Sequence, residues 1–457
     1  MLTETAYEES PPSLPSFWPR VREFAVPPSM IETATARRCA GDWAGACAAA
    51  GIDVDLNLRC VARRYGHELA TRIRADLRQL APDLLRWHMP RIAPDGLLRP
   101  GLTIALVRYE GPSPVQLVVR TPPAWADGGQ RISLALWDRS CAEPGARSHP
   151  HPHPDRRFRF DLHRHLWDAG RSGELKVRAG VGQLAADEGL LGLGSGHCAV
   201  DRWADEAGIL LRSEGRTTGT VAVRVGSQHW LALDLVTGRD GTGPPALRTT
   251  AAPTDGSSAV LPVLPDAATW VLPDLELIRT GAIEADRLHP LVASVLVPDR
   301  RADGGASWTP DRAGRPRIVE CRDARHRIGL VDGVLTPLDH DPVEIRREEL
   351  LAALGGPPLP CLQAIDEAHR RPECLAGVRE RLIHGDITGA LDVVESLLGA
   401  GASLRHGALR DELQAAADRR IAHGLFRAGL AVPEPRRPRP HRSPRDQRSH
   451  PRQATFR

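Results

Sequence analysis

The residues best suited to chemistry are one carboxylate and two imidazoles close together in the first half of the chain. Asp161, His163 and His165 alternate with other side chains within residues 158–166. The alternation of this stretch predicts a β-strand, which would place all three side chains on one face. A zinc or iron ion takes three or four such ligands, and i, i+2 spacing on a strand supplies two of them. A metal site at Asp161, His163 and His165 is therefore one hypothesis.

The same pattern has a second interpretation, in which the polar residues form the solvated face of a half-buried strand. Three more histidines, at positions 149, 151 and 153, alternate with proline just upstream. A polyproline-like segment has about three residues per turn, so these histidines are expected to point in different directions. The sequence leaves the metal site and the structural strand as alternatives.

Two other stretches contain residue types found in active sites. Residues 192–197, GLGSGH, have glycines at alternate positions and lack the GxGxxG spacing of a dinucleotide loop. The residues two positions either side of Ser195 are Leu193 and His197, so a nucleophile elbow is excluded and a flexible loop is expected. Asp339-His340-Asp341 precedes a proline and resembles a turn at the start of a helix; it could hold a divalent ion only with ligands from elsewhere.

Composition excludes several classes of enzyme. The chain has 457 residues, of which 41% are hydrophobic and 26% charged, which is enough for two to four domains with a buried core. Lys176 is the single lysine, and it does not follow a glycine as the lysine of a GxxxxGK phosphate loop must. A Schiff-base enzyme would depend on this one lysine, in the strand-like run 174–178. No cofactor is identified.

The cysteines predict a reduced protein. They are scattered and form no CxxC pair, so we expect mostly buried free thiols in a cytoplasmic protein, and neither a disulfide framework nor a cysteine zinc site. The N-terminal residues are acidic and lack the apolar core of a signal peptide. No apolar run approaches the roughly 18 residues of a membrane span, so no membrane partner is expected. The eight cysteines are at positions 39, 47, 60, 141, 198, 321, 361 and 374.

Hydrophobic periodicity predicts an α+β chain of several units, with a helical N-terminal unit, a β-rich middle with interspersed helices and a helical C-terminal unit. Strands are expected at 102–109, 115–120 and 131–137, and a hairpin at 220–236 with a two-residue turn. Phe17 and Trp18 could anchor the N-terminal arm to the body. The expected parts are a disordered or extended arm (1–28), a helical unit (29–98), a β-rich α+β domain (99–238), a linker (239–258), a smaller α+β region with a β-hairpin (259–343), a helical unit (344–433) and a disordered Arg/Pro-rich tail (434–457).

Two amphipathic helices are the best-patterned elements near the C-terminus. One apolar stripe is expected at 387, 391, 394 and 398, and a second at 413, 417, 421 and 425. Residues 389–404, GALDVVESLLGAGASL, resemble the second half of an ankyrin repeat. The resemblance covers about one repeat, whereas a stable stack needs at least three, so a packed helix pair is the interpretation.

The segment LIHGD, residues 382–386, resembles the catalytic loop of aminoglycoside-phosphotransferase-like kinases. In that family the aspartate is a catalytic base, and an asparagine five residues later holds magnesium. Here Leu391 occupies the asparagine position. Asp386 is therefore interpreted as the N-cap of the helix that follows.

The C-terminal tail is strongly basic. Residues 436–457 contain eight arginines and one aspartate, which contribute +7 to a net charge of +3 and leave −4 for the rest of the chain. Such a tail could bind nucleic acid or another polyanion in a salt-dependent way. The alternative is a solvated terminus without a partner. The candidate polyanion-binding residues are Arg436, Arg437, Arg439, Arg442, Arg445, Arg448 and Arg452.

Three functional hypotheses follow from these patterns. The leading one is a cytoplasmic, non-catalytic protein-binding, scaffold or regulatory module with an unknown protein partner, because well-patterned folding elements occur without a complete catalytic motif. The second is a metal-dependent hydrolase that uses Asp161, His163 and His165. The third is a nucleic-acid-associated protein that binds through the arginine-rich tail.

Overall fold

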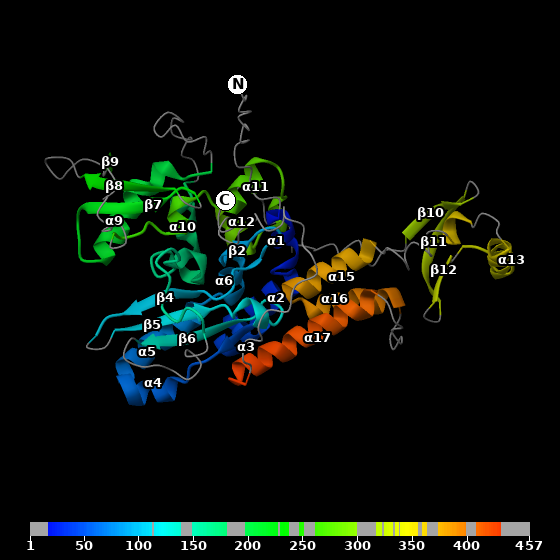
Figure 1. The fold of residues 1–457 in the computed structure, drawn as a ribbon, viewed down its shortest axis with the longest axis horizontal. Coiled ribbons are helices and arrows are strands. Elements are labelled where there is room, and N and C mark those ends of the chain that lie inside the picture. The colour runs from blue at the N-terminus through cyan, green and yellow to red at the C-terminus, as the bar shows by residue number, and fades with distance from the viewer. Residues whose placement is uncertain are drawn as a thin grey trace, which may run out of the picture. The chain divides into compact units, whose positions relative to one another are not determined.

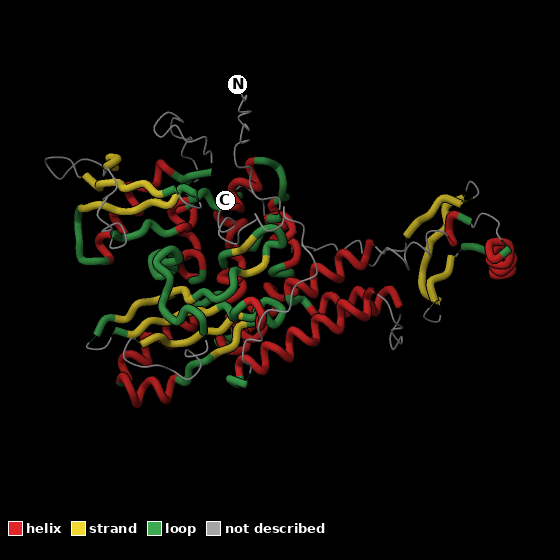
Figure 2. Tube along the Cα trace, viewed as in Figure 1, coloured by secondary structure: helices red, strands yellow, loops and turns green. Residues whose placement is uncertain are grey.

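The computed structural model has a mixed α+β fold, which confirms the predicted fold class (Figure 1; Figure 2). Its residues form two compact units, one of residues 1–303 together with 423–457, and a second of residues 304–422. We refer to them as unit 1 and unit 2. The structure describes residues 17–111, 114–138, 149–180, 197–226, 229–236, 246–250, 261–298, 317–321, 324–331, 334–337, 339–354, 359–362, 373–398 and 408–430.

Unit 1 begins with a series of short helices. The predicted helical unit is divided at two glycines, Gly41 (φ 77°) and Gly66 (φ 94°). Glycine adopts positive φ without steric cost, so each of these residues ends one helix and redirects the chain into the next. The helices are α1 (Trp18–Phe24), α2 (Pro28–Cys39), α3 (Trp43–Ala49), α4 (Leu58–Tyr65), α5 (His67–Gln79) and α6 (Pro82–His88).

A four-stranded sheet of order β1-β6-β5-β4 forms the centre of unit 1. β1 runs parallel to β6, and the other neighbours are antiparallel. The strands are apolar almost throughout and buried, because helices cover the sheet; α4 and α5 lie below β4, β5 and β6 in Figure 1. The three predicted strands are confirmed to within a residue. The bounds are β1 (Ile52–Val54), β4 (Thr103–Tyr109), β5 (Val115–Arg120) and β6 (Ile132–Asp138), with a separate ribbon of β2 (Arg91–Ile92) and β3 (Leu97–Leu98).

A second sheet of order β7-β8-β9 packs on α9 through Trp203, Leu210, Val221 and Leu233. The predicted hairpin is confirmed, but its turn is longer than predicted: Arg224 pairs with Trp230, and Val225 N donates to His229 O at 3.0 Å. The bounds are β7 (Gly219–Arg224), β8 (Trp230–Val236), β9 (Ala246–Thr250), α8 (Leu175–Arg178), α9 (Trp203–Ser213), α10 (Asp266–Thr269), α11 (Pro273–Arg279) and α12 (Pro290–Leu296). Short 3-10 helices are η1 (Ala124–Ala126), η2 (Arg164–Leu166), η3 (Ala169–Glu174), η5 (Val200–Arg202) and η7 (Ala285–Arg287).

Two expected strands of unit 1 have other structures. Residues 158–166 follow a bent path that ends in η2 and make one isolated parallel bridge, between Arg159 and Ala105. The alternation that predicted a strand arises because Phe158 and Phe160 enter the core. The polar side is not solvated either, since Arg159, His163 and His165 are buried. The run around Lys176 is the helix α8.

The main core of unit 1 joins its N-terminal helices, the central sheet and the helices α11 and α12. Phe17 and Trp18 are buried in this core, which confirms that they anchor the start of the chain. Arg22 of α1 donates to Asp274 of α11 at 2.8 Å and to Trp87 O at 2.7 Å. Its guanidinium lies 4.8 and 4.4 Å from the ring centroids of Trp18 and Trp87. One buried ion pair therefore links segments that are far apart in the sequence.

Unit 2 contains an antiparallel sheet of order β10-β11-β12 and several helices. β11 and β12 are antiparallel neighbours, with Val331 paired with Val334, which confirms the β-hairpin predicted within residues 259–343. Gly389 N donates to Asp386 Oδ1 at 3.0 Å, which confirms Asp386 as a helix N-cap. The bounds are β10 (Arg317–Cys321), β11 (Ala324–Val331), β12 (Val334–Pro337), α13 (Pro342–Ala353), α15 (Glu373–His384), α16 (Ile387–Leu398) and α17 (Ala408–Arg427). From His423 onward α17 belongs to unit 1.

The two predicted C-terminal helices are confirmed as α16 and α17, but their predicted stripes are only partly buried: Val394 lies in the buried cluster and Ile387 and Leu413 pack against it. Leu391 is 42% exposed and Ile421 is 61% exposed, although both were expected on an apolar contact face. The buried contacts of α15, α16 and α17 in unit 2 are made by Val378, Leu382, Ala390, Val394 and Ala416.

Several predictions fall outside the described residues: the first sixteen residues of the arm, the GLGSGH segment up to Gly196, most of the linker and the tail from residue 431. The division into seven parts stays a prediction. Among the helices that the structure describes, none is long and apolar enough to cross a membrane.

Replacing Asp274 with alanine is expected to destabilise unit 1 strongly, because it leaves the buried charge of Arg22 without a counter-ion. The expected loss in the free energy of unfolding is about 3–5 kcal/mol. Urea denaturation followed by tryptophan fluorescence measures it. The control is Arg37→Ala, which breaks an exposed pair with Asp42 and should cost less than about 1 kcal/mol. Equal, small losses in both variants would contradict a structural role for the Arg22–Asp274 pair.

Candidate Asp/His site

The segment that carries Asp161, His163 and His165 is held against the central sheet by its backbone. Asp161 N donates to Ala105 O at 2.9 Å, next to the bridge between Arg159 and Ala105. His163 N and Leu166 N then close tight turns on Phe160 O and His163 O. The chain therefore curves away from β4 after Asp161 and enters η2, so Asp161, His163 and His165 do not share one strand face.

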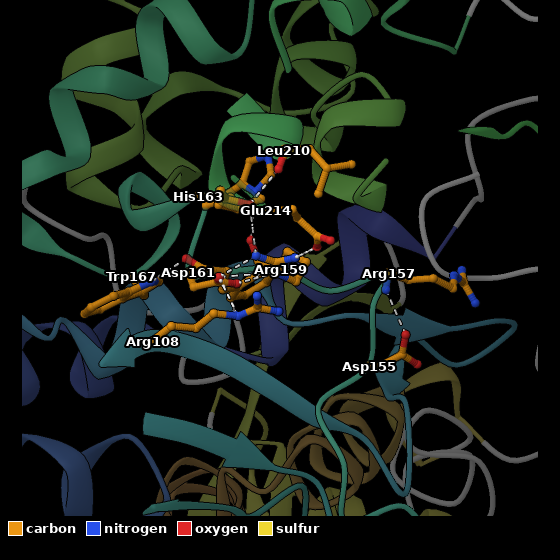
Figure 3. A network of polar contacts seen from close by, with 12 residues as sticks. Arg108, Asp155, Arg157, Arg159, Asp161, His163, Trp167, Leu210 and Glu214 are labelled. Carbon is orange, nitrogen blue, oxygen red and sulfur yellow. Dashed lines mark hydrogen bonds and ion pairs between the residues drawn. The ribbon is translucent and has the colours of Figure 1, made fainter. Parts of the chain in front are cut away.

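Asp161 is engaged by two arginines. Arg159 Nε and Nη2 donate to its two carboxylate oxygens at 2.8 and 2.9 Å, and Arg108 Nε lies 3.2 Å from Oδ2. Figure 3 shows both guanidinium groups directed at this carboxylate. Arg159 also contacts Glu214 at 3.3 Å, at the C-terminal end of α9. Asp161 is therefore the counter-ion of Arg108 on β4 and of Arg159 in the bent segment 158–166, and Arg159 extends the network to the end of α9.

His163 bridges the bent segment to α9. Its Nδ1 donates to Arg159 O at 2.9 Å, and its Nε2 lies 3.3 Å from Glu206 Oε2. Glu206 in turn accepts from Arg178 Nε and Nη2 at 2.6 and 2.7 Å, a bidentate pair. Both nitrogens of His163 therefore face protein groups, and neither is directed at a shared metal position with Asp161.

His165 lies next to His163 but has different surroundings. The two rings are 5.7 Å apart, edge to face, and within the described residues Nδ1 of His165 is buried without a hydrogen-bond partner. Burial, together with the charges of His163 and Arg178, lowers the pKa of His165 well below its usual value and keeps the ring neutral. His165 lines a cavity of about 20 Å³ with His88, Arg178 and other residues. This volume admits about one water molecule and no substrate.

The upstream histidines point in different directions, as their alternation with proline predicts. His149 is buried with Nε2 2.9 Å from Thr121 O. His153 packs edge to face against Trp137, with ring centroids 5.8 Å apart. Neither contacts the three predicted ligands through any interaction found among the described residues.

Two groups of residues that the fold brings together could not be found from the sequence. Glu206 and Arg178 complete the network in unit 1, but both lie on helices that were not connected with the histidines by any spacing. In unit 2, Cys321, His340 and Cys361 have potential ligand atoms that all lie within 4.8 Å of one another. Among the described residues this is the group of three or more such side chains close enough to share a metal ion. Cys321, His340 and Cys361 are too far apart in the sequence to form a recognisable local motif.

Comparison of the chain with protein-family models, with curated proteins and with solved structures found no match.

Glu206 is expected to make stability depend on pH. Burial raises the pKa of its carboxyl group, but the contacts from His163 and Arg178 outweigh burial and lower the pKa from 4.5 to about 2. A depressed pKa in the folded state stabilises the protein at pH values above the unfolded value. That stabilisation is lost as the pH falls from about 4.5 towards 2, and it amounts to about 3 kcal/mol.

The matched variant is Glu206→Gln, which keeps the shape of the side chain but removes its titration. The free energy of unfolding, measured by urea denaturation at a series of pH values, should fall less steeply in acid for the variant than for the wild type. Identical slopes between about pH 5 and pH 2 would show that the network does not hold Glu206 ionised.

Proposed function

We propose that the protein acts by binding another protein, as a scaffold or regulatory module, through the outward face of α13. We call this surface the α13 face; it consists of Val343, Arg347, Leu350, Leu351 and Leu354. The observation that carries the proposal is the exposure of its aliphatic residues. Val343 is 59% exposed, Leu350 62% and Leu354 85%.

The periodicity of α13 explains how four aliphatic side chains come to lie outside. Val343, Leu350 and Leu354 are separated by seven and four residues, which places them along one line of a helix. Ile345 lies on the opposite side and is 8% exposed, so it fixes the helix to unit 2. A stripe of aliphatic side chains on a helix, directed at solvent, is typical of a protein-binding surface.

The charges beside the stripe favour an acidic partner. Arg346 and Arg347 are both exposed, and Arg347 lies within the α13 face itself. A complementary partner would offer an apolar groove lined by carboxylates, so that the leucines are buried while the arginines find counter-ions.

The metal-hydrolase hypothesis has weaker support. The carboxylate of Asp161 is occupied by two arginines, and His163 is occupied by Arg159 O and Glu206. The nucleic-acid hypothesis depends on the arginine-rich tail, which lies outside the described residues. It stays a separate prediction that the same binding experiment can test.

Replacing Leu350 and Leu354 with aspartate in the full-length chain is expected to abolish binding to the protein partner. Both side chains are exposed, so the fold should be kept while an apolar contact is replaced by carboxylates that repel an acidic partner. The measurement is affinity capture from native lysate with nuclease present, quantified for proteins that the wild type retains. We expect at least a tenfold loss for the double variant and an unchanged circular dichroism spectrum.

The control is Leu430→Asp, which changes a similarly exposed leucine (71%) that is not part of α13 and should leave capture unchanged. A chain ending at Pro433 tests the tail in the same experiment. Retention of the same proteins by the Leu350/Leu354 variant would contradict the α13 face as the binding surface. Capture that requires nucleic acid and the tail would instead support the nucleic-acid hypothesis.

A further inference from the structure

We propose that Cys321, His340 and Cys361 form a binding site for a divalent metal ion, with zinc as the ion that fits the ligands best. Two thiolates and one imidazole are a ligand set typical of zinc, and soft sulfur ligands disfavour magnesium and calcium. The ligand atoms lie within 4.8 Å of one another. In a tetrahedral zinc site such atoms are about 3.5–4 Å apart, so a small contraction brings all three onto one ion.

The hairpin of β10 and β11 presents the first thiol. Cys321 pairs with Ala324, and Val319 pairs with His326, so Val319, Cys321 and His326 share one face of the ribbon. The segment 359–362 packs on that face. Leu359 and Cys361 are buried in one apolar cluster with Cys321, and Val319 contacts the same cluster. The thiols of Cys321 and Cys361 are close enough to hydrogen-bond to each other.

His340 is held in place by contacts on both sides. The preceding residue, Asp339, accepts from the backbone N–H of Arg327 at 2.8 Å and from its Nη2 at 3.0 Å, which ties the chain to β11. The ring of His340 then stacks on His326 at a centroid distance of 3.8 Å and an interplanar angle of 12°. The imidazole is therefore positioned before any ion binds, as a metal site requires.

The two nitrogens of His340 have different surroundings, which indicates the ligand atom. Nδ1 lies 3.7 Å from Glu344 Oε2, and the side chain is 5% exposed. Nε2 is buried and has no hydrogen-bond partner among the described residues. A buried nitrogen without a partner is unfavourable, and coordination of a metal removes that cost. Glu344 then serves as the outer carboxylate that orients a metal-bound histidine.

Charge balance also favours a dication at this position. When Zn²⁺ binds, each thiol releases one proton to solvent, so two thiolates neutralise the two charges of the ion. The resulting centre is neutral and can remain among Leu359, Val319 and Leu362 without a buried net charge. A fourth ligand, protein or water, completes the tetrahedron. A disulfide between Cys321 and Cys361 would leave Nε2 of His340 buried without a partner, which argues for the metal.

The test is the metal content of full-length, untagged protein purified under reducing conditions without a chelating column. Elemental analysis should find about one zinc ion per chain. Titration of the metal-free wild type with cobalt(II) should produce a thiolate-to-cobalt charge-transfer band in the near ultraviolet, and this readout does not depend on how any variant folds. Cys321→Ser, His340→Gln and Cys361→Ser should each lose the zinc, with a weaker band in the two serine variants.

The matched controls are Cys39→Ser and His67→Gln, which change an exposed cysteine and an exposed histidine and should retain the zinc. Three results would overturn the proposal. They are wild-type protein that holds no zinc and gives no cobalt–thiolate band, zinc retained equally by the three ligand variants, and a Cys321–Cys361 disulfide in protein that is alkylated at lysis.

Discussion

The arrangement of unit 1 depends on buried ion pairs, because a charged side chain that is removed from water needs a partner. Arg22 reaches Asp274, Arg157 reaches Asp266, Arg159 reaches Asp161 and Arg178 reaches Glu206, and at least one side chain of each pair is almost completely buried. An isolated buried ion is so costly that each partner is fixed in position by the other. Three of these pairs connect segments that are separated in the sequence, so ion pairing acts together with the hydrophobic core to hold the helices and the two sheets of unit 1 together.

Much of the local structure could be predicted from the sequence, because it depends on local patterns. The apolar runs of β4, β5 and β6 and the Asp386 N-cap each follow from a few neighbouring residues. The expected strand at 158–166 was wrong because the same alternation also results when two phenylalanines enter the core while Arg159 pairs with Asp161 two residues on. An alternating pattern shows that successive side chains face different surroundings. It does not show whether the polar side chains face solvent or buried partners.

The candidate sites were less predictable, since their members are distant in the sequence. Asp339-His340-Asp341 was identified as needing ligands from elsewhere, but the fold alone reveals that Cys321 and Cys361 lie beside His340. This cluster lies at the start of α13. Asp341 Oδ1 accepts from Val343 N at 2.9 Å, and Glu344 of the first turn faces His340. A metal ion at the cluster would therefore fix the N-terminal end of the helix that carries the α13 face.

The proposed metal site and the proposed binding surface are thus joined: a metal ion at Cys321, His340 and Cys361 would order the helix that carries the α13 face. Hydrogen–deuterium exchange of the full-length protein, zinc-loaded and after chelation, tests it most directly. We expect faster exchange of the α13 amides after chelation, because the helix loses the contacts that fix its N-terminal end, and unchanged exchange in α4 and α5 of unit 1, whose ion pairs remain intact. Exchange in α13 that is the same with and without zinc would contradict the claim.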